Sequence, residues 1–333
     1  MKKINIPVVW LIILIFGTGI FFGCGSSTLD DENGVTSPES EFTIFTNETG
    51  LADNWITDIV VDSIHRGVWC ATLNGISFYS CDDSTWTTYG AESDIPDMKV
   101  KSLALDYFTG SVLAGTESGS AVFNDSLWTA FADMDSLVHR NITTVVIMND
   151  GSLWFGTRGG VSILSYNGWS SYTAYSGLSG DDVTSIAASA TGDIWVGTTN
   201  GISVFDGKGW TSYGLPELPS TYVRSLYKDN SGRMWCGTNT IAVSFDGERW
   251  VKYGQADGLA AQGINDFVQD KFGKIWAVTD GGVFYFPGDK WHELDIPEKV
   301  DGEIMTTIAE DVSSGVLWIG TSNGLVKYKQ GLN

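Results

Sequence analysis

Cysteine, histidine and arginine are scarce in this 333-residue chain, which contains four, three and six of them. The three histidines, His65, His139 and His292, lie far apart, and no Cys/His cluster has the spacing of zinc ligands. The chain also lacks a Gly-rich phosphate loop and a Gly-x-Ser-x-Gly nucleophile elbow. The common signatures of zinc enzymes, P-loop proteins and serine hydrolases are therefore missing.

Positive charge is the second shortage. Lysine and arginine total 19 against 40 aspartates and glutamates, which gives a formal net charge of −21. Removal of Lys2 and Lys3 with an N-terminal leader would change this value to −23. Because nucleic acid binding depends on positive surface charge, we do not expect nucleic acid as a partner.

Tryptophan, by contrast, is abundant and recurs at intervals of 40 to 44 residues. A first marker column contains Trp69, Leu113, Trp154, Trp195, Trp235, Trp276 and Trp318. A second column contains Trp86, Trp128, Trp169, Trp210, Trp250 and Trp291. A unit of about 41 residues suits four short strands with tight turns. Radial repetition of such a unit predicts an all-β fold, a seven-bladed β-propeller of four-stranded blades.

The second column has one member fewer than the first, and Phe42-Thr43-Ile44-Phe45 supplies the missing piece. This segment matches Trp210-Thr211-Ser212-Tyr213 in spacing and aromatic character. We therefore predict that the N-terminal strand completes the last blade and leaves no free sheet edge. Residues 41–329 then form one closed domain, followed by a short tail at 330–333.

Several repeated columns are interpreted as structural. A threonine hydroxyl that bonds backbone in the next turn explains Thr72, Thr116, Thr157, Thr198, Thr238, Thr279 and Thr321. A turn with positive φ explains Gly75, Gly119, Gly160, Gly201, Gly282 and Gly324. An aspartate that accepts bonds from turn N–H groups explains Asp62, Asp106, Asp229, Asp270 and Asp311. The tryptophan columns are interpreted as packing between blades, with a sugar-stacking platform as the alternative.

The N-terminus resembles a bacterial lipoprotein signal peptide: Lys2-Lys3, a nearly continuous apolar run from Val8 to Phe22, then Gly23-Cys24. The resemblance implies cleavage after residue 23, lipidation of Cys24 and, since Gly25 replaces the retention aspartate, the outer rather than the inner membrane. Residues 24–40 are predicted to be a flexible tether. The alternative is an uncleaved signal anchor spanning Ile6 to Gly23.

With Cys24 lipidated, Cys70, Cys81 and Cys236 cannot all pair with one another, so no disulfide framework is predicted. Cys70 and Cys236 each follow a marker tryptophan, where other blades have apolar or small residues. We interpret these two as small buried hydrophobes.

The repeat resembles the two-component regulator propeller repeat. The pattern is carried by Val183-Thr-Ser-Ile186, Gly192-Asp-Ile-Trp-Val-Gly-Thr198, Asn200-Gly-Ile202 and Trp210-Thr-Ser-Tyr213. In that family such propellers often form the periplasmic sensory half of hybrid histidine kinases, and many respond to oligosaccharides. These 333 residues include no kinase sequence, so we expect the sensor role to carry over only as ligand or protein binding.

A binding site is expected where the repeats differ, on the face formed by the loops that lead into each innermost strand. We predict a ligand-binding face made of Trp55, His139, Arg140, Asn141, Asp182, Tyr222 and Arg224. The alternative for each of these residues is a solvated loop surface.

Small polar residues form a further column on the innermost strands: Asp58, Ser102, Thr144, Ser185, Ser225, Asp266 and Thr307. We interpret this column as allowing close approach of the blades near the axis. Asp58 and Asp266 are the two candidate ligands for a cation such as calcium, which prefers oxygen ligands. No other cofactor is expected.

Three functional classes remain for what is predicted to be a monomeric propeller held on the cell envelope by its lipidated N-terminus. The first is an exported binding or scaffold module for a glycan, a peptide or an envelope protein. The second is an exported lyase or glycosidase that uses acidic loop residues, since the Asp-turn-Gly-x-x-Trp pattern is similar to the sialidase Asp box. The third is an assembly platform of an envelope or secretion machine.

Overall fold

The computed structural model describes residues 42–124, 126–131, 133–260, 263–297, 300 and 303–330. The predicted signal peptide, Cys24 and the tether therefore lie outside the described residues. Within the described part, no helix is long and apolar enough to cross a bilayer.

Seven four-stranded antiparallel sheets make up the domain. The first three are β2 (Ile56–Asp62), β3 (Gly67–Thr72), β4 (Gly75–Ser80), β5 (Trp86–Tyr89); β6 (Val100–Leu105), β7 (Val112–Thr116), β8 (Gly119–Asn124), β9 (Leu127–Ala130); and β10 (Ile142–Ile147), β11 (Leu153–Thr157), β12 (Gly160–Ser165), β13 (Gly168–Tyr172). The fourth and fifth are β14 (Val183–Ala188), β15 (Ile194–Thr198), β16 (Gly201–Phe205), β17 (Trp210–Tyr213); and β18 (Val223–Lys228), β19 (Met234–Thr238), β20 (Ala242–Phe245), β21 (Trp250–Tyr253). The last two are β22 (Ile264–Gln269), β23 (Ile275–Thr279), β24 (Gly282–Phe286), β25 (His292–Glu293); and β26 (Met305–Asp311), β27 (Val316–Thr321), β28 (Gly324–Lys329), β1 (Phe42–Phe45).

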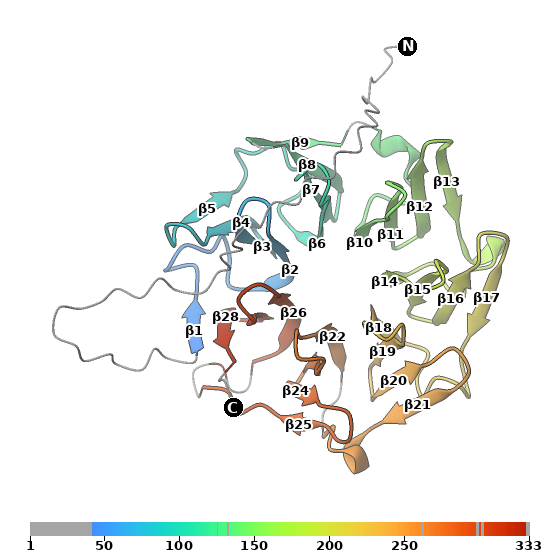
Figure 1. The fold of residues 1–333 in the computed structure, drawn as a ribbon. Coiled ribbons are helices and arrows are strands. Elements are labelled where there is room, and N and C mark those ends of the chain that lie inside the picture. Colours follow the sequence, from blue (N-terminus) through green and yellow to red (C-terminus); the bar gives the residue numbers. More distant parts are fainter. Residues whose placement is uncertain are drawn as a thin grey trace, which may run out of the picture.

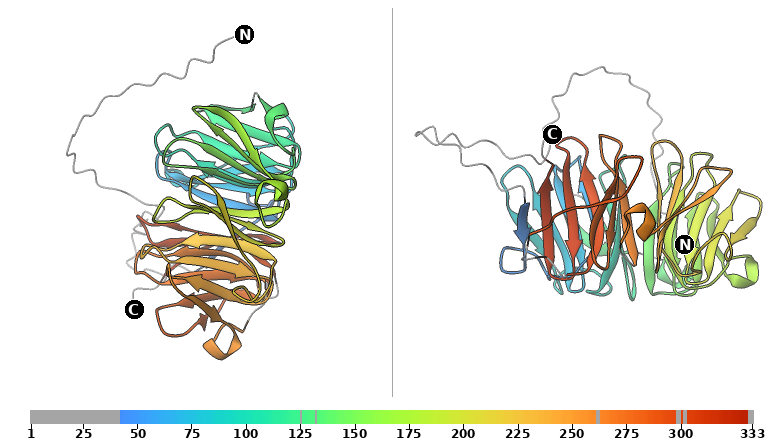
Figure 2. Two further views of the ribbon diagram at one scale, coloured as in Figure 1. Left: turned by 90° about the vertical axis from the view of Figure 1, so that its right-hand side faces the viewer. Right: turned by 90° about the horizontal axis from the view of Figure 1, so that it is seen from below.

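The sheets are arranged as blades around a central axis, in chain order (Figure 1). The first strand of each blade, from β2 to β26, lies next to the axis, and the fourth strand lies at the rim. Figure 2 shows the ring from the side, with the strands running between its two faces. The described loops between blades contain three short 3-10 helices, Met134–Ser136, Ala174–Ser176 and Gln255–Asp257. The predicted seven-bladed, all-β architecture is confirmed.

The ring is closed by the N-terminal strand, as the sequence predicts. Strand β1 pairs antiparallel with β28, so that Phe42 faces Tyr328 and Phe45 faces Leu325. The rings of Phe42 and Tyr328 stack at 4.7 Å between centroids. Every blade therefore has four strands, and no fourth-strand position is left empty.

The core consists of clusters that join each blade to the next. Trp69 of the first blade is buried and contacts Phe123 and Trp128 of the second, with ring centroids 4.9 and 5.8 Å apart. Trp235 of the fifth blade contacts Phe286 and Trp291 of the sixth in the same way, at 5.8 Å each. The tryptophan columns therefore pack between blades, as predicted, and are not a surface platform.

The threonine and glycine columns form one repeated turn. Thr72 donates its hydroxyl to the carbonyl oxygen of Gly75 at 2.8 Å and accepts the N–H of Asn74 at 3.1 Å. Gly75 has φ of +116°, and a Cβ at this position would lie 2.4 Å from the carbonyl oxygen of Tyr89. The predicted roles of both columns are confirmed.

The aspartate column accepts backbone N–H groups, as predicted, and has a second role as well. In Asp62, Asp229 and Asp270 one carboxylate oxygen accepts turn N–H groups. The other oxygen accepts the indole N–H of the buried marker tryptophan at 2.9 Å, in the pairs Asp62–Trp69, Asp229–Trp235 and Asp270–Trp276. In these three blades the aspartate thus satisfies a buried donor that would otherwise weaken the packing between blades.

Two of the cysteines match the prediction and one does not. Cys70 and Cys236 are buried and free, and burial raises the pKa of both thiols. Cys81, for which the sequence predicted no part in a disulfide framework, is disulfide-bonded.

Candidate functional site

A β-bulge occurs at the same place in every innermost strand. The pairing register with the second strand shifts between the first and third residues of all seven innermost strands. One extra residue therefore sits in each bulge, and a bulge re-aims the side chain of that residue. These residues are Thr57, Lys101, Thr143, Thr184, Arg224, Asn265 and Thr306.

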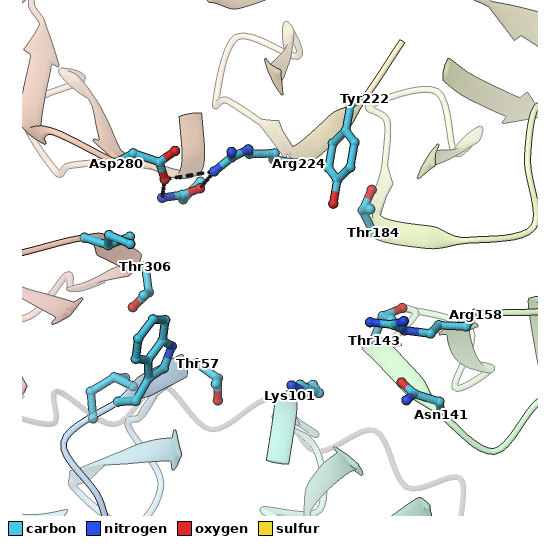
Figure 3. A pocket seen from close by; sticks show the side chains of 14 residues that line it. Thr57, Lys101, Asn141, Thr143, Arg158, Thr184, Tyr222, Arg224, Asp280 and Thr306 are labelled. Atoms are coloured by element: carbon cyan, nitrogen blue, oxygen red, sulfur yellow. Dashed lines mark hydrogen bonds and ion pairs between the residues drawn. The ribbon is translucent and has the colours of Figure 1, made fainter. Parts of the chain in front are cut away.

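All seven bulge residues line a single cavity of about 620 Å³. Because each blade contributes one of them, the cavity lies on the axis, at the face where the innermost strands begin. The side chains labelled in Figure 3 point toward this cavity from the surrounding blades. The cavity falls within the range of about 300–1,000 Å³ that small-molecule sites occupy.

The remaining lining residues come from two sets of loops. Residues just before the innermost strands contribute Trp55, Asn141, Tyr222 and Ile304, and the strand residue Ile56 adds to them. Arg158 and Asp280 come from the turns between the second and third strands of their blades. Trp55 is 39% exposed and Tyr222 is 40% exposed. Aromatic rings exposed to this degree offer flat apolar surfaces to a ligand.

Arg224 is held in place by a network that joins two blades. Its Nη1 bonds the carboxylate of Asp280 at 2.8 Å and the amide oxygen of Asn265 at 2.6 Å. Its Nε donates to Asn239 at 2.5 Å. The two Nη1 contacts are the dashed lines from Arg224 in Figure 3. The donors of this guanidinium are thus largely used within the protein.

The other two cations of the cavity are less engaged. Lys101 pairs with Glu117 at 3.1 Å, and Glu117 also contacts Lys99 at 3.3 Å. The hydrogen bond from Lys101 holds the pKa of the Glu117 carboxyl below its usual value. The exposed side chain of Arg158 makes no ion pair or hydrogen bond with any residue that the structure describes.

Threonine hydroxyls at the cavity wall fall into two groups. Thr57 donates to the carbonyl oxygen of Val100 at 2.7 Å, and Thr143 donates to that of Val183 at 2.6 Å. Each of these bonds joins one innermost strand to the next. The hydroxyl oxygens of Thr184 and Thr306 are buried and have no partner among the described residues.

The structure brings together four of the seven predicted binding residues. Trp55, Asn141, Tyr222 and Arg224 line the cavity. His139, Arg140 and Asp182 belong to loops at the same face but are not among its lining residues. Arg140 pairs with the exposed Asp135 at 2.5 Å, and His139 accepts the N–H of Asn141 at 3.0 Å.

Of the bulge column, sequence reasoning found only Arg224, and it missed Arg158 and Asp280. The signal was present as variation at the second residue of each innermost strand, where four blades have threonine and the other three have lysine, arginine or asparagine. The prediction concentrated on the loop residue two positions earlier. Asp280 is the one carboxylate that the described part of the chain contributes to the lining.

Asp58 and Asp266 lie on strands β2 and β22, each one residue after the bulge residue that lines the cavity. Asp58 accepts the N–H groups of Ile59 and Leu103 at 2.8 and 2.7 Å. Asp266 accepts the N–H of Ile308 at 3.1 Å and the hydroxyl of Thr307 at 2.9 Å. Leu103 and Ile308 belong to the next blades along the chain, so both carboxylates join neighbouring innermost strands.

Burial raises the pKa of Asp58 to about 7, and the nearby Asp266 carboxylate adds to this shift. Burial likewise raises the pKa of Asp266 to about 6. Across the described part of the chain, no group of three or more His, Cys, Asp or Glu side chains is placed to hold a metal ion. The calcium hypothesis stays a prediction.

A second hollow, of about 610 Å³, lies between the third and fourth blades at the opposite face. Trp154, Tyr172 and Phe205 contribute apolar surface to it. Its charged lining residues are Asp150, Asp193 and Asp206. The two cavities are therefore alike in size and opposite in charge.

The chain is similar to known propellers in sequence and in structure. The family model "two component regulator propeller" matches residues 177–200 and 217–240. The extracellular domain of the putative hybrid two component system BT3049 from B. thetaiotaomicron is 20% identical, with a TM-score of 0.76, over 88% of this chain and 41% of that one. PorZ of Porphyromonas gingivalis is 16% identical, with a TM-score of 0.70, over 84% of this chain and 47% of that one.

Virginiamycin B lyase from Staphylococcus aureus is 14% identical, with a TM-score of 0.70, over 87% of this chain and 99% of that one. No curated protein sequence matches the chain. The chain spans less than half of the BT3049 domain and of PorZ. At these identities the likeness establishes the propeller fold and leaves activity open.

Proposed function

We propose that this protein is an exported binding module of the cell envelope that takes a small ligand in its axial cavity. The observation that carries the proposal is the convergence of seven bulge residues, one from each blade, on a single cavity of about 620 Å³. Bulges concentrate next to functional sites because they re-aim side chains. Exposed rings and polar groups together provide apolar contact and orientation, as in small-molecule sites generally.

Two of the similar structures support a role at the cell surface. One is described as the extracellular domain of a putative hybrid two component system, and PorZ as a bacterial surface component of the type-IX secretion system. The first favours a sensor-like role and the second a scaffold role. Because the axial cavity has the size of a small-molecule site, we favour ligand binding over the scaffold role. We propose a glycan or a peptide as the ligand, and a monomeric propeller.

Binding can be tested by the thermal unfolding of the full chain, purified in detergent, against panels of glycans, peptides and metal ions. A ligand present at 100 times its Kd should stabilise the native state by about 2.7 kcal/mol. Trp55→Ala and Tyr222→Ala should remove this rise, since both rings line the cavity.

Tyr166→Ala is the matched control, because Tyr166 is almost fully exposed and lies outside the cavity. A rise that survives both cavity substitutions would contradict the placement of the site. If no compound raised the unfolding temperature, the binding proposal would give way to the scaffold role with an envelope protein partner.

The anchor of the module is proposed to be a lipid on Cys24, in the outer membrane. The intact mass of the mature chain should show loss of residues 1–23 and addition of diacylglycerol at Cys24, and Cys24→Ser should abolish both. Cys81 is disulfide-bonded in the structure, and a sulfur atom that carries diacylglycerol cannot also pair with it, so the anchor further requires a free Cys81 thiol in the mature chain. A mature mass without lipid and with Cys24 in a disulfide would therefore rule out the anchor.

A further inference from the structure

The charge of the axial cavity is opposite to the charge of the chain. The protein has a formal net charge of −21. Among the described residues, however, the cavity is lined by Lys101, Arg158 and Arg224 against one carboxylate, that of Asp280. Figure 3 shows Lys101 and Arg158 on one side of the cavity and Arg224 with Asp280 on the other. Cations collected at one point of an acidic protein indicate a local preference for negative charge.

Arg158 is the cation available to a ligand. Arg224 already bonds Asn239, Asn265 and Asp280, and Lys101 pairs with Glu117. Arg158 has no such contact with the residues that the structure describes. A guanidinium offers planar pairs of N–H donors that match a carboxylate or a sulfate group. One anionic group of a ligand would therefore bind here, with Lys101 on the neighbouring blade as a second source of positive charge.

The rest of the cavity wall suits a ligand rich in hydroxyl groups. The buried hydroxyls of Thr184 and Thr306 have no partner within the described structure. Rotation of either side chain about χ1 toward a bound ligand would form a hydrogen bond that the free protein lacks. Trp55 and Tyr222 add two half-exposed rings from different blades. Sugars combine hydroxyl groups with apolar ring faces, and both features are matched here.

We infer that the axial cavity binds an acidic sugar, and that Arg158 holds its carboxylate or sulfate group. This inference rests on the proposed function and names its ligand class. The hollow between the third and fourth blades, which has nearly the same volume, is lined by three aspartates and would repel the same ligand. Of these two hollows, only the axial cavity has the charge to hold an acidic sugar.

The test is isothermal titration of the full chain with uronate-bearing and sulfated oligosaccharides, each beside a neutral counterpart. The neutral counterparts are the methyl esters of the uronates and the unsulfated sugars, which lack the negative charge and keep the same sugar rings and linkages. A charge-assisted hydrogen bond typically contributes enough that Arg158→Gln should weaken acidic ligands by about 10- to 100-fold. The neutral counterparts should be unaffected by this substitution. Arg249→Gln removes the same charge from an exposed turn outside the cavity and should change neither affinity.

The outcomes separate this inference from the proposed function. Equal binding of acidic and neutral sugars, with Arg158→Gln silent, would overturn the acidic class and leave the binding function standing. Preference for acidic peptides over all sugars would overturn the sugar assignment. If no sugar or peptide bound, the proposed function itself would fail. Tighter binding of the uronate-bearing oligosaccharides would identify a carboxylate as the group that Arg158 holds, and tighter binding of the sulfated ones would identify a sulfate.

Discussion

Deletion of β1 should destabilise the propeller more than any single substitution in it. The deletion removes the pairing of Phe42–Phe45 with β28 and leaves β28 as an open edge. It also removes Phe45, whose ring lies 5.3 Å from Tyr79, 5.4 Å from Trp86 and 6.1 Å from Trp318. Phe45 thus connects the last blade to the first, and an open edge invites pairing with other chains.

The single substitution Phe45→Ala should lower the free energy of unfolding by about 3 kcal/mol, since the ring is half-buried and leaves a cavity behind. Phe108→Ala is the matched control, because Phe108 is 89% exposed and should change stability by no more than about 0.5 kcal/mol. Denaturant unfolding measures both variants, and light scattering measures association of the β1 deletion. A deletion variant that stayed monomeric and unfolded at the same denaturant concentration would show that closure adds no stability.

The fold was predictable because a unit of about 41 residues that occurs seven times is compatible with few fold classes other than a propeller. The interval between marker tryptophans gave the length of one repeat and so predicted a four-stranded blade. The aromatic segment Phe42–Phe45 predicted the strand that closes the ring. The turn chemistry of Thr72 and Gly75 also followed from the sequence, since a residue type required in every blade answers a need common to all blades.

The indole contacts of the aspartate column were not predicted. Asp270 was expected to bond turn N–H groups, and it also accepts the indole N–H of Trp276. In the third and fourth blades Met148 and Ser189 replace this aspartate, and the hollow of about 610 Å³ opens between those two blades. The joint presence of aspartate and tryptophan in a repeat does not by itself signal this contact, because the last blade has Asp311 and Trp318 and the indole N–H of Trp318 has no partner among the described residues.

The cavity was harder to predict because bulges break the alternation of side chains. Simple alternation places the first and third residues of an innermost strand on one face and the second on the other. The register shift between Val223 and Ser225 shows that Arg224 instead occupies a bulge, where its direction depends on local backbone geometry. Arg158 and Asp280 reach the cavity from turns in other strands, so only the closed ring brings them together.

The stability of the propeller should depend on pH through the two carboxyls beside the axis. The pKa values of Asp58 and Asp266 are raised to about 7 and about 6 in the folded protein, from 3.8. The folded state therefore holds protons that the unfolded state has released. Their contribution to stability is fully present below pH 3.8 and is lost as pH rises through about 6 and 7.

Each carboxyl should contribute a slope of about 1 kcal/mol per pH unit within its window. Asp58→Asn and Asp266→Asn each remove one titrating carboxyl. The free energy of unfolding of the variant, relative to wild type, should therefore increase as pH rises from 4 to about 7 for Asp58→Asn and to about 6 for Asp266→Asn. Any lost hydrogen bond to Leu103 or Ile308 lowers stability by a constant amount and leaves the slope unchanged. Parallel curves for wild type and both variants would contradict the raised pKa values.

If calcium binds the ionised pair, adding it at pH 8 should stabilise the wild type and not the variants, because only ionised carboxylates attract the ion.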